Sequence, residues 1–199
     1  MQNPSEQCYE AAQSLLLYAG KTRGLSLHYS SDYKIPEDLA SQSDAIRKCR
    51  GIFAYSDSTW TAPKSTCGYV VFMAGGPVAF SSRKLNIIAD SSALAEYSAG
   101  SACSKELTYI RNLQTELDNS LSGPIVMGVD NTACIKISNE PGAGKLTKHF
   151  DFAQFRLRDE VENLRLTTVW VSTDYQTADI FTKALDEKTF LYHRGKLMR

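Results

Sequence analysis

The chain lacks an excess of charge of either sign. Its 199 residues include 22 Lys and Arg against 22 Asp and Glu, so the formal net charge is zero. A strong basic excess is the simplest mark of a nucleic-acid-binding protein, and its absence removes that argument. It does not exclude a local basic face, because phosphate binding depends on where the charges lie.

Long apolar runs are also missing. No run approaches the ~20 residues that cross a bilayer, so we expect no membrane association. The opening sequence, Met-Gln-Asn-Pro-Ser-Glu-Gln, is polar, and no basic stretch leads into an apolar one, so we expect a chain that is not secreted. A hydrophobic content of 43% with 22% charged residues is typical of a globular protein.

Cysteines are few, odd in number and scattered. No Cys-x-x-Cys spacing occurs, which argues against both a zinc site and a disulfide framework. We expect buried thiols in a reducing compartment. The five residues are Cys8, Cys49, Cys67, Cys103 and Cys134.

The first 50 residues differ from the rest of the chain in composition and in hydrophobic pattern. Helical spacing of Ala and Leu predicts a helix over 5–19, capped by Ser5 and stopped by Gly20. A short strand is expected over 25–29. Residues 30–50 are polar and contain Pro36, which favours a linker or a surface loop, and we expect a domain boundary there.

From Gly51 the pattern changes to strands followed by α/β alternation. A Gly75-Gly76 turn between two apolar runs indicates a β-hairpin. This order predicts a mixed sheet with helices on its faces. Strands are expected over 52–56, 66–73, 77–82, 124–129 and 166–171, and helices over 90–118 (one, or two in tandem), 131–138, 147–163 and 176–185, followed by a basic tail.

Four acidic residues occupy informative positions. Asp57 and Asp130 each close an apolar strand, and adjacent strand ends meet at one edge of a sheet. Glu96 has small or apolar neighbours along its helix face, so it points toward packing partners. Asp179 opens the last expected helix. Taken singly, acidic residues are mostly solvated surface residues, caps or turn formers.

Eight short sequence motifs resemble those of a known protein family. From Gly51 to its end the chain resembles the ribonuclease H domain of copia-type (Pseudoviridae-like) LTR retrotransposon Pol polyproteins. Residues 5–29 resemble the end of the preceding reverse transcriptase region, although no Tyr-x-Asp-Asp polymerase motif occurs. The matching segments are Tyr55-Ser-Asp-Ser-Thr-Trp60, Lys64-Ser-Thr-Cys-Gly-Tyr69, Ser81-Ser-Arg-Lys84, Ser91-Ser-Ala-Leu-Ala-Glu-Tyr97, Val129-Asp-Asn-Thr-Ala133, Lys148-His-Phe-Asp151, Leu157-Arg-Asp-Glu-Val161 and Thr177-Ala-Asp-Ile-Phe-Thr-Lys183.

The resemblance implies a fold and a division of the chain. The fold would be α/β and ribonuclease H-like, with a mixed five-stranded sheet of three antiparallel strands and two parallel additions, flanked by helices. Residues 1–50 would be a remnant of the reverse transcriptase thumb or connection plus a linker. Residues 51–199 would form the ribonuclease H-like domain.

The resemblance also implies an activity. The domain would cut the RNA strand of RNA–DNA hybrids endonucleolytically during retrotransposon reverse transcription. Crowded carboxylates repel one another and are stable mainly with cations bound. Two Mg²⁺ or Mn²⁺ ions ~4 Å apart would compensate the carboxylate charges. They would also stabilise the attacking and leaving oxygens of an in-line displacement. Hard oxygen ligands favour these ions over zinc. The catalytic and metal-binding residues would be Asp57, Glu96, Asp130 and Asp179.

Partners and location follow from the same resemblance. The substrate would be an RNA–DNA hybrid, read largely through its backbone and 2′-hydroxyls. Trp60 could pack against a sugar or lie in the core. The reverse transcriptase domain of the same polyprotein would be a partner, and the location would be cytoplasmic, in virus-like particles, or nuclear. Expected nucleic-acid contacts are Ser58, Ser92, Asn131, Lys148, His149 and Arg156.

Some features leave other functions open. Many ribonucleases H carry a mobile histidine in the loop before the final aspartate, but the loop over 172–177 has none. We therefore expect slower, metal-dominated catalysis. Alternatives are a catalytically silent or domesticated module that binds nucleic acid, a connection-like structural domain, and a related nuclease of the same fold.

Overall fold

A five-stranded mixed sheet forms the centre of the molecule. The computed structural model describes residues 4–139 and 155–199. Strands β3, β2 and β1 are antiparallel neighbours, while β4 and β5 add parallel to β1, giving the order β3-β2-β1-β4-β5. This confirms the predicted mixed sheet. The strands are β1 (Phe53–Thr59), β2 (Thr66–Met73), β3 (Gly76–Lys84), β4 (Ile125–Val129) and β5 (Leu166–Trp170).

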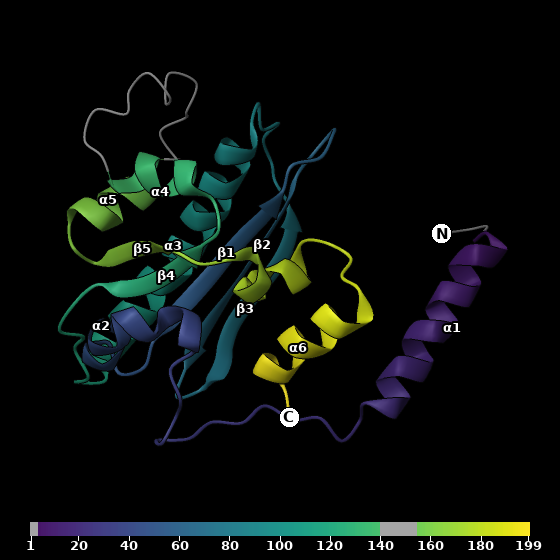
Figure 1. The fold of residues 1–199 in the computed structure, drawn as a ribbon, viewed down its shortest axis with the longest axis horizontal. Coiled ribbons are helices and arrows are strands. Elements are labelled where there is room, and N and C mark those ends of the chain that lie inside the picture. Colours follow the sequence, from purple (N-terminus) through teal and green to yellow (C-terminus); the bar gives the residue numbers. More distant parts are fainter. Residues whose placement is uncertain (1–3, 140–154) are drawn as a thin grey trace.

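Helices cover both faces of the sheet (Figure 1). The first face packs against α3 (Ser92–Glu116), α4 (Thr132–Asn139) and α5 (Arg156–Glu162). The second face packs against residues of η1 (Glu37–Gln42), α2 (Ser43–Lys48), η5 (Thr177–Phe181) and α6 (Glu187–Leu197). The remaining helical segments of the described residues are α1 (Glu6–Lys21) and η4 (Thr173–Tyr175).

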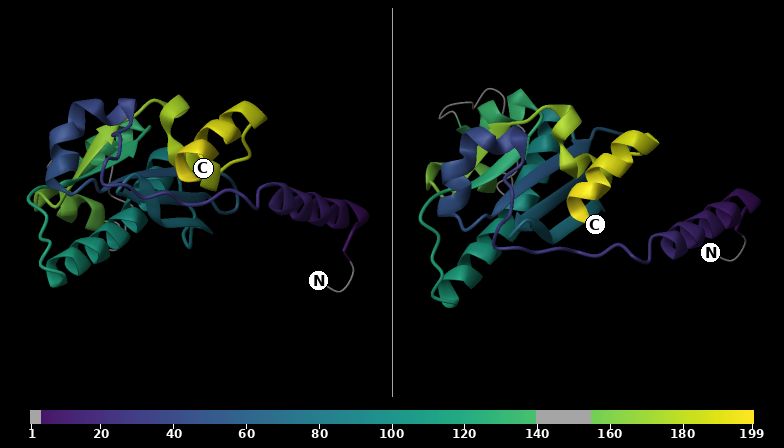
Figure 2. Two further views of the ribbon diagram at one scale, coloured as in Figure 1. Left: turned by 90° about the horizontal axis from the view of Figure 1, so that it is seen from below. Right: turned by 60° about the horizontal axis from the view of Figure 1, so that its bottom comes forward.

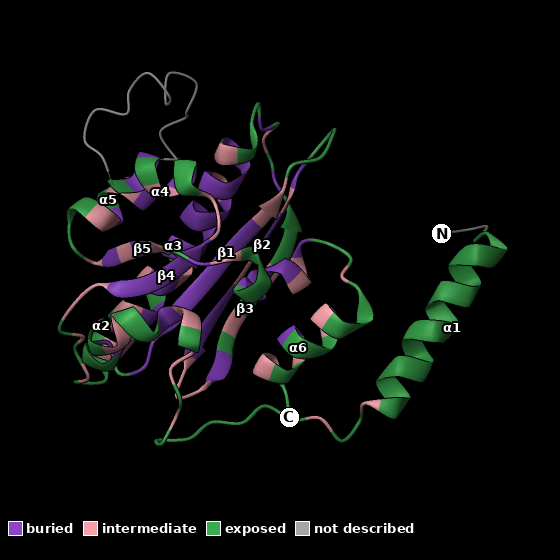
Figure 3. Cartoon of the chain, viewed as in Figure 1, coloured by how far each residue is buried: buried purple, intermediate pink, exposed green. Residues whose placement is uncertain are grey.

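The alternation of side chains along β1 divides the core into two layers. Ala54 faces the α3 side, while its neighbours Phe53 and Tyr55 face the opposite layer. Successive strand residues point to opposite faces, and here both faces are buried, so the strand is apolar throughout its first half. The sheet therefore contributes to two hydrophobic cores, and Figure 3 shows its centre as buried.

The hairpin between β2 and β3 turns one residue earlier than expected. Ala74 and Gly75 have positive φ angles of 52° and 79°, and Gly76 already belongs to β3. Two central residues with positive φ match the right-handed twist of the flanking strands. The predicted hairpin is confirmed, with Ala74-Gly75 as its turn.

The predictions for residues 25–50 are partly wrong. Residues 25–29 form no strand, although the backbone of Ser26 exchanges hydrogen bonds with Arg199 (2.8 and 3.0 Å). The stretch expected to be a linker contains η1 and α2, whose Leu39 and Ile46 are fully buried on the sheet. A mostly polar stretch with two anchoring apolar residues therefore packs onto the 51–199 region.

The C-terminal predictions also need correction. The helix expected over 176–185 is the short 3₁₀ segment η5, and the expected basic tail contains α6. Lys196 of α6 places its ammonium 5.9, 5.6 and 4.6 Å from the ring centroids of Tyr55, Tyr175 and Tyr192. The contact with Tyr55 joins α6 to β1 and the contact with Tyr175 joins it to η4, while Tyr192 belongs to α6 itself.

The structure has helices where the other helix predictions place them, within the described residues. The region 90–118 is one helix, α3, and α4 matches the expected 131–138. Of the helix expected over 147–163, the part within the described residues is α5. Ser5 caps α1 as predicted, its hydroxyl accepting from the Cys8 N–H, but the helix continues past Gly20 to Lys21.

The helix α1 projects away from the rest of the molecule (Figure 2). None of its residues, all of which the structure describes, is buried. Its contacts with α6 come from Tyr18, whose ring lies 6.0 Å from that of Phe190 and whose hydroxyl accepts from Arg194. Among the described residues, no helix combines the length and the apolar character that crossing a membrane requires.

The cysteines are free thiols. Cys49, Cys67, Cys103 and Cys134 are buried, as predicted. Cys8 lies on the exposed helix α1, so the prediction of burial is wrong for it.

Candidate active site

Three aspartates from separate elements come together beside the sheet. One carboxylate oxygen from each of Asp57, Asp130 and Asp179 lies within 4.8 Å of the other two. Asp130 directly follows β4, which runs parallel to β1, so the two strands bring their aspartates to the same region. Asp57 lies within β1, not after it as expected, because the strand continues to Thr59.

The fourth acid, Glu96, reaches this group from the first half of α3. The backbone N–H of Ser58 donates to Oε1 of Glu96 (3.2 Å), which fixes the carboxyl next to Asp57. Burial raises the pKa of Glu96 to about 9, and the charges of Asp57 and Asp130 add to this rise. The four predicted acids therefore lie close together, although among the described residues only the three aspartates have oxygens within 4.8 Å of one another.

The pKa values of the neighbouring aspartates are also raised. Burial, followed by the charge of Asp57, raises the pKa of Asp130 above its ordinary value. The same two causes, in the same order, raise the pKa of Asp179 to about 7. Each shift means that the ionised form is disfavoured in the metal-free protein.

The residues present fit a divalent metal ion. Oε2 of Glu96 and Oδ1 of Asp179 are buried and have no hydrogen-bond partner among the described residues. Buried carboxylate oxygens without donors are costly, and coordination by a hard cation would satisfy them. The ligands are all carboxylate oxygens, which suits Mg²⁺ or Mn²⁺.

The turn that follows Asp179 contacts the carboxylates of Asp57 and Asp179. The backbone N–H groups of Thr182 and Lys183 both donate to the carbonyl of Asp179 (3.1 Å each). From this turn the Thr182 hydroxyl donates to Oδ2 of Asp57. The Lys183 ammonium lies 2.8 Å from Oδ2 of Asp179 and 4.0 Å from Oδ2 of Asp57. Both contacts come from residues that we did not predict for the site.

The protonation of Lys183 is maintained by its neighbours. Burial lowers the pKa of this ammonium, but the hydrogen bond to Asp179 and the charges of Asp57, Asp179 and Asp130 outweigh it, so the pKa lies above its ordinary value. The i,i+4 spacing of Asp179 and Lys183 was the available sequence signal for this pair.

Gln176 anchors the start of the same segment. Its fully buried amide donates to the carbonyl of Ser56 on β1 (3.1 Å), and its carbonyl oxygen accepts from Ala178 N–H (3.3 Å). One side chain therefore joins the loop to the strand that carries Asp57. A single glutamine in a polar loop gave no sequence signal for this role.

A glycine on β2 allows the close approach of this segment. Gly68 pairs with Asp57 across the β1–β2 ladder. A Cβ at Gly68 would come 2.7 Å from Cβ of Phe181 and 2.8 Å from Cγ2 of Thr182. The absence of a side chain at this position therefore makes room for the turn that contacts Asp57.

The loop before Asp179 has no histidine, but it contacts the site. The hydroxyl of Thr173 donates to Oδ2 of Asp130 (3.1 Å). His193 of α6 is fully buried, and burial, followed by the charges of Lys196 and Lys183, lowers its pKa to about 4. Its ring is therefore neutral near pH 7.

The expected nucleic-acid contacts differ in their surroundings. Ser58 is half-buried beside Glu96, and Ser92 is exposed at the start of α3. The Asn131 side chain accepts from the Cys134 N–H (3.1 Å), so it caps α4. Lys148 and His149 lie outside the described residues.

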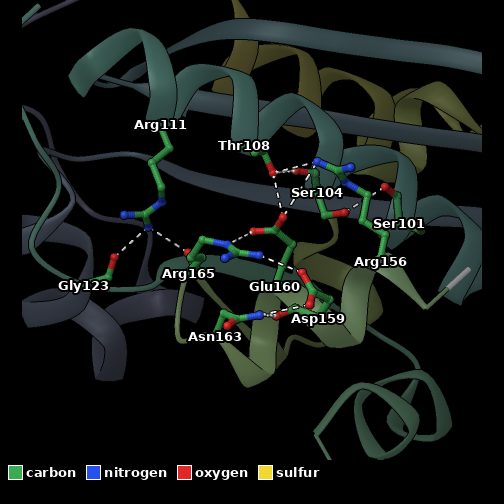
Figure 4. Close-up of polar contacts among 10 residues, drawn as sticks. All are labelled: Ser101, Ser104, Thr108, Arg111, Gly123, Arg156, Asp159, Glu160, Asn163 and Arg165. Carbon is green, nitrogen blue, oxygen red and sulfur yellow. Dashed lines mark hydrogen bonds and ion pairs between the residues drawn. The ribbon is translucent and has the colours of Figure 1, made fainter. Parts of the chain in front are cut away.

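Arg156 belongs to a polar network between α3 and α5 (Figure 4). Its guanidinium donates to the Thr108 hydroxyl (3.2 Å) and lies 3.8 Å from the Glu160 carboxylate. These contacts are intramolecular, while the Arg156 side chain remains 37% exposed. Its predicted contact with nucleic acid stays a prediction.

Trp60 lies at the surface and not in the core. It follows β1, three positions after Asp57, and is 59% exposed. Its indole N–H donates to the carbonyl of Ala89 (2.8 Å), which fixes the ring beside the exposed Ile88. An exposed, anchored aromatic ring close along the chain to the acids is a suitable surface for a sugar or a base.

Comparison with known proteins identifies the homologues. The chain is 33% identical over 150 residues to the retrovirus-related Pol polyprotein from transposon RE1 of Arabidopsis thaliana, which covers 73% of the chain. It is 35% identical over 143 residues to that from transposon RE2 of the same plant, covering 70% of the chain. A Nicotiana tabacum relative, the Pol polyprotein from transposon TNT 1-94, is 26% identical over 194 residues and covers 96% of the chain.

These matches span only a small part of the relatives. The chain covers 10% of the length of the two Arabidopsis polyproteins and 13% of the tobacco one. No family model matches the chain. Among solved structures, the LC11 ribonuclease H1 isolated from compost is similar with a TM-score of 0.47 and 16% identity, covering 66% of this chain and 91% of that one.

Proposed function

We propose that this chain, whose homologues are Pol polyproteins of copia-like transposons, hydrolyses the RNA strand of RNA–DNA hybrids as a metal-dependent endonuclease during reverse transcription. The observation that carries the proposal is the convergence of four acids from four segments. Three of them lie within 4.8 Å of one another, and two buried oxygens in the set have no partner among the described residues. Packing alone does not call for such an arrangement.

The metal-binding residues would be Asp57, Glu96, Asp130 and Asp179. Two bound Mg²⁺ or Mn²⁺ ions would activate the attacking water and stabilise the leaving 3′ oxygen of the scissile phosphodiester. The protein fixes the ligands before any ion binds, because Ser58 holds Glu96 and Thr173 holds Asp130. Preorganised ligands reduce the reorganisation that catalysis requires.

Substrate contacts would surround these acids. Trp60 offers an exposed ring, and Ser92 lies exposed at the start of the helix that carries Glu96. The Ser58 hydroxyl is buried beside Asp57 and has no hydrogen-bond partner among the described residues. We propose that these groups, together with Asn131, Lys148, His149 and Arg156, contact the sugar-phosphate backbone of the hybrid. Such contacts position the substrate without reading its sequence.

The partner would be the reverse transcriptase region of the same polyprotein. We propose residues 1–50 as the end of that region and 51–199 as the ribonuclease H-like domain. The alignment with the tobacco relative extends over 96% of the chain, so it includes most of the N-terminal residues. Leu15, Leu16 and Leu17 of α1 are more than 60% exposed and would contact the polymerase. Figure 3 shows this helix as exposed along most of its length.

The proposed setting is the cytoplasm, including virus-like particles there, or the nucleus. Reverse transcription of a retrotransposon would bring the hybrid and the domain together in either place.

A cleavage assay tests the proposal. The protein is incubated with an end-labelled RNA–DNA hybrid in Mg²⁺ or Mn²⁺, beside Asp57→Asn, Asp130→Asn and the control Asp44→Asn. Asp44 is an exposed residue of α2. We expect the wild type and the control to cut the RNA strand, leaving a 5′ phosphate and a 3′ hydroxyl, and both site variants to be inactive.

Other outcomes separate the alternatives. Hybrid binding without cleavage would support a silent, nucleic-acid-binding module. Cleavage of double-stranded DNA or RNA in place of the hybrid would point to a related nuclease. Cleavage that survives both site substitutions would refute the assignment of the acids.

A further inference from the structure

The ammonium of Lys183 occupies a position that a bound cation would also favour. It lies 2.8 Å from Oδ2 of Asp179 and 4.0 Å from Oδ2 of Asp57. These oxygens belong to two of the four proposed metal ligands. The contact is built into the fold, because the N–H of Lys183 also donates to the carbonyl of Asp179 (3.1 Å).

Lys183 forms ion pairs with only two of the four acids. Its ion pairs are with Asp57 and Asp179, whereas the described contacts of Asp130 and Glu96 are the hydroxyl of Thr173 and the N–H of Ser58. One side of the acid group therefore has an internal cation. The other side has only neutral donors among its described contacts.

We infer that Lys183 is an internal counter-cation that offsets one of the two negative charges of Asp57 and Asp179 in the metal-free protein and must leave when a divalent ion binds the same oxygens. This inference rests on the proposed function, since it takes the four acids as metal ligands. A metal ion and an ammonium beside the same oxygens repel each other, so the lysine lowers the affinity of that position. Two ions should therefore bind with unequal affinities, the weaker at the Asp57–Asp179 side.

The side chain has room to move. It is 35% exposed, and lysine carries its charge on a flexible four-carbon stem. Rotation about that stem would carry the ammonium into water while the Lys183 backbone stays bonded to Asp179. The anchored backbone would keep the lysine ready to return when the ion leaves.

The test measures metal binding directly, without a nuclease assay. Mn²⁺ is titrated calorimetrically into the wild type, Lys183→Met, Lys183→Gln and the control Lys188→Met, which removes an exposed lysine of α6. We expect both Lys183 variants to bind the weaker Mn²⁺ about tenfold more tightly or better, and the control to match the wild type. Lys183→Gln can still donate to Asp179, so it separates the effect of charge from that of the hydrogen bond.

Thermal unfolding in a chelator gives a second readout. Loss of the internal cation leaves the carboxylates uncompensated, so both Lys183 variants should unfold at lower temperature than the wild type without metal and gain more from Mn²⁺. A purely structural lysine would lower the unfolding temperature but would not tighten the metal.

The inference and the proposed function fail in different ways. Equal or weaker Mn²⁺ binding in Lys183→Gln and Lys183→Met would overturn the counter-cation role, as would an absence of Mn²⁺ binding in every variant. If the wild type fails to cut the hybrid while the Lys183 variants bind Mn²⁺ more tightly, the proposed function fails and the counter-cation role stands.

Discussion

The hydroxyl of Thr182 donates a hydrogen bond to the carboxylate of Asp57, which lies 125 residues earlier in the chain. One residue is at the end of the η5 turn and the other is within β1. The contact joins the first strand of the 51–199 region to its last loop. The geometry of the acids therefore depends on how closely this turn approaches the sheet.

Gly68→Ala should separate the turn from β1. Its Cβ would lie 2.7 Å from Cβ of Phe181 and 2.8 Å from Cγ2 of Thr182, so one of the two segments must shift. Overpacking of this kind costs about 1–3 kcal/mol of unfolding free energy. Urea denaturation measures the loss, and hybrid cleavage should fall with it.

The control for this substitution is Gly123→Ala. Its nearest neighbour would be Cβ of Lys48 at 3.8 Å, an ordinary contact, so stability should barely change. Equal losses for both variants would contradict the steric explanation.

The metal-free protein should lose stability as the pH rises. The pKa of Asp179 is raised to about 7 and that of Glu96 to about 9 in the folded protein, from ordinary values of 3.8 and 4.5. A raised acid pKa stabilises the fold fully below the unfolded value, and this contribution is lost as the pH rises through the folded value. In a chelator, the unfolding temperature should therefore fall between about pH 4 and about pH 9.

Glu96→Gln and added metal test the origin of this slope. Glu96→Gln removes the group with the higher pKa, so the unfolding temperature should decrease less steeply above about pH 7. Saturating Mg²⁺ should reduce or reverse the slope, because the ion favours the ionised carboxylates. An unchanged profile in Glu96→Gln would show that other groups control it.

How much of this site could be predicted depends on the kind of signal. The four acids were found because motifs surround them, and the hairpin of β2 and β3 because apolar runs flank a glycine turn. Lys183 was missed despite its i,i+4 spacing from Asp179, and Gln176 and Thr182 were missed because their contacts are with β1, which is far away in the sequence. Such contacts leave no local periodicity.

The errors in the fold have a similar cause. The segment 176–185 has apolar residues at helical spacing, but it forms only the short η5, which Gln176 caps at its start and which ends in the turn around the Asp179 carbonyl. The helix α6 has one buried residue, His193, so it shows no amphipathic pattern. In both places tertiary contacts outweigh local preference.

Trp60→Ala should weaken binding of the hybrid more than it slows cleavage. The ring is 59% exposed, so its removal costs the fold little, but a surface for a sugar or base is lost. Stacking of an aromatic ring on nucleic acid contributes about 1–3 kcal/mol, which predicts a rise in KM of about tenfold with a smaller change in kcat.

Tyr109→Ala is a control for Trp60. This tyrosine is 62% exposed on the second half of α3, 13 residues after Glu96 along the same helix. Steady-state kinetics on the hybrid should show a normal KM for Tyr109→Ala. An equal rise in KM for both variants would argue against a specific contact at Trp60.

The Glu160 network should contribute to stability and not to the chemistry. Glu160 is 5% exposed, and its carboxylate accepts from Arg165 at 2.7 Å and from the Thr108 hydroxyl at 3.0 Å (Figure 4). Breaking a buried pair by removing one partner costs about 3–5 kcal/mol, and the 38% exposure of Arg165 reduces this. We expect Glu160→Ala to lose about 2–3 kcal/mol of unfolding free energy.

Asp159→Asn provides the comparison, because Asp159 pairs with the same arginine at the same 2.7 Å distance but is 62% exposed. An exposed pair contributes about 1 kcal/mol or less, so this variant should be close to wild type in denaturant unfolding. Both variants should bind Mn²⁺ normally, because the network belongs to the α3–α5 interface and shares no side chain with the acid group. A large loss in Asp159→Asn, or weakened Mn²⁺ binding in either variant, would mean that the two networks are coupled through α3.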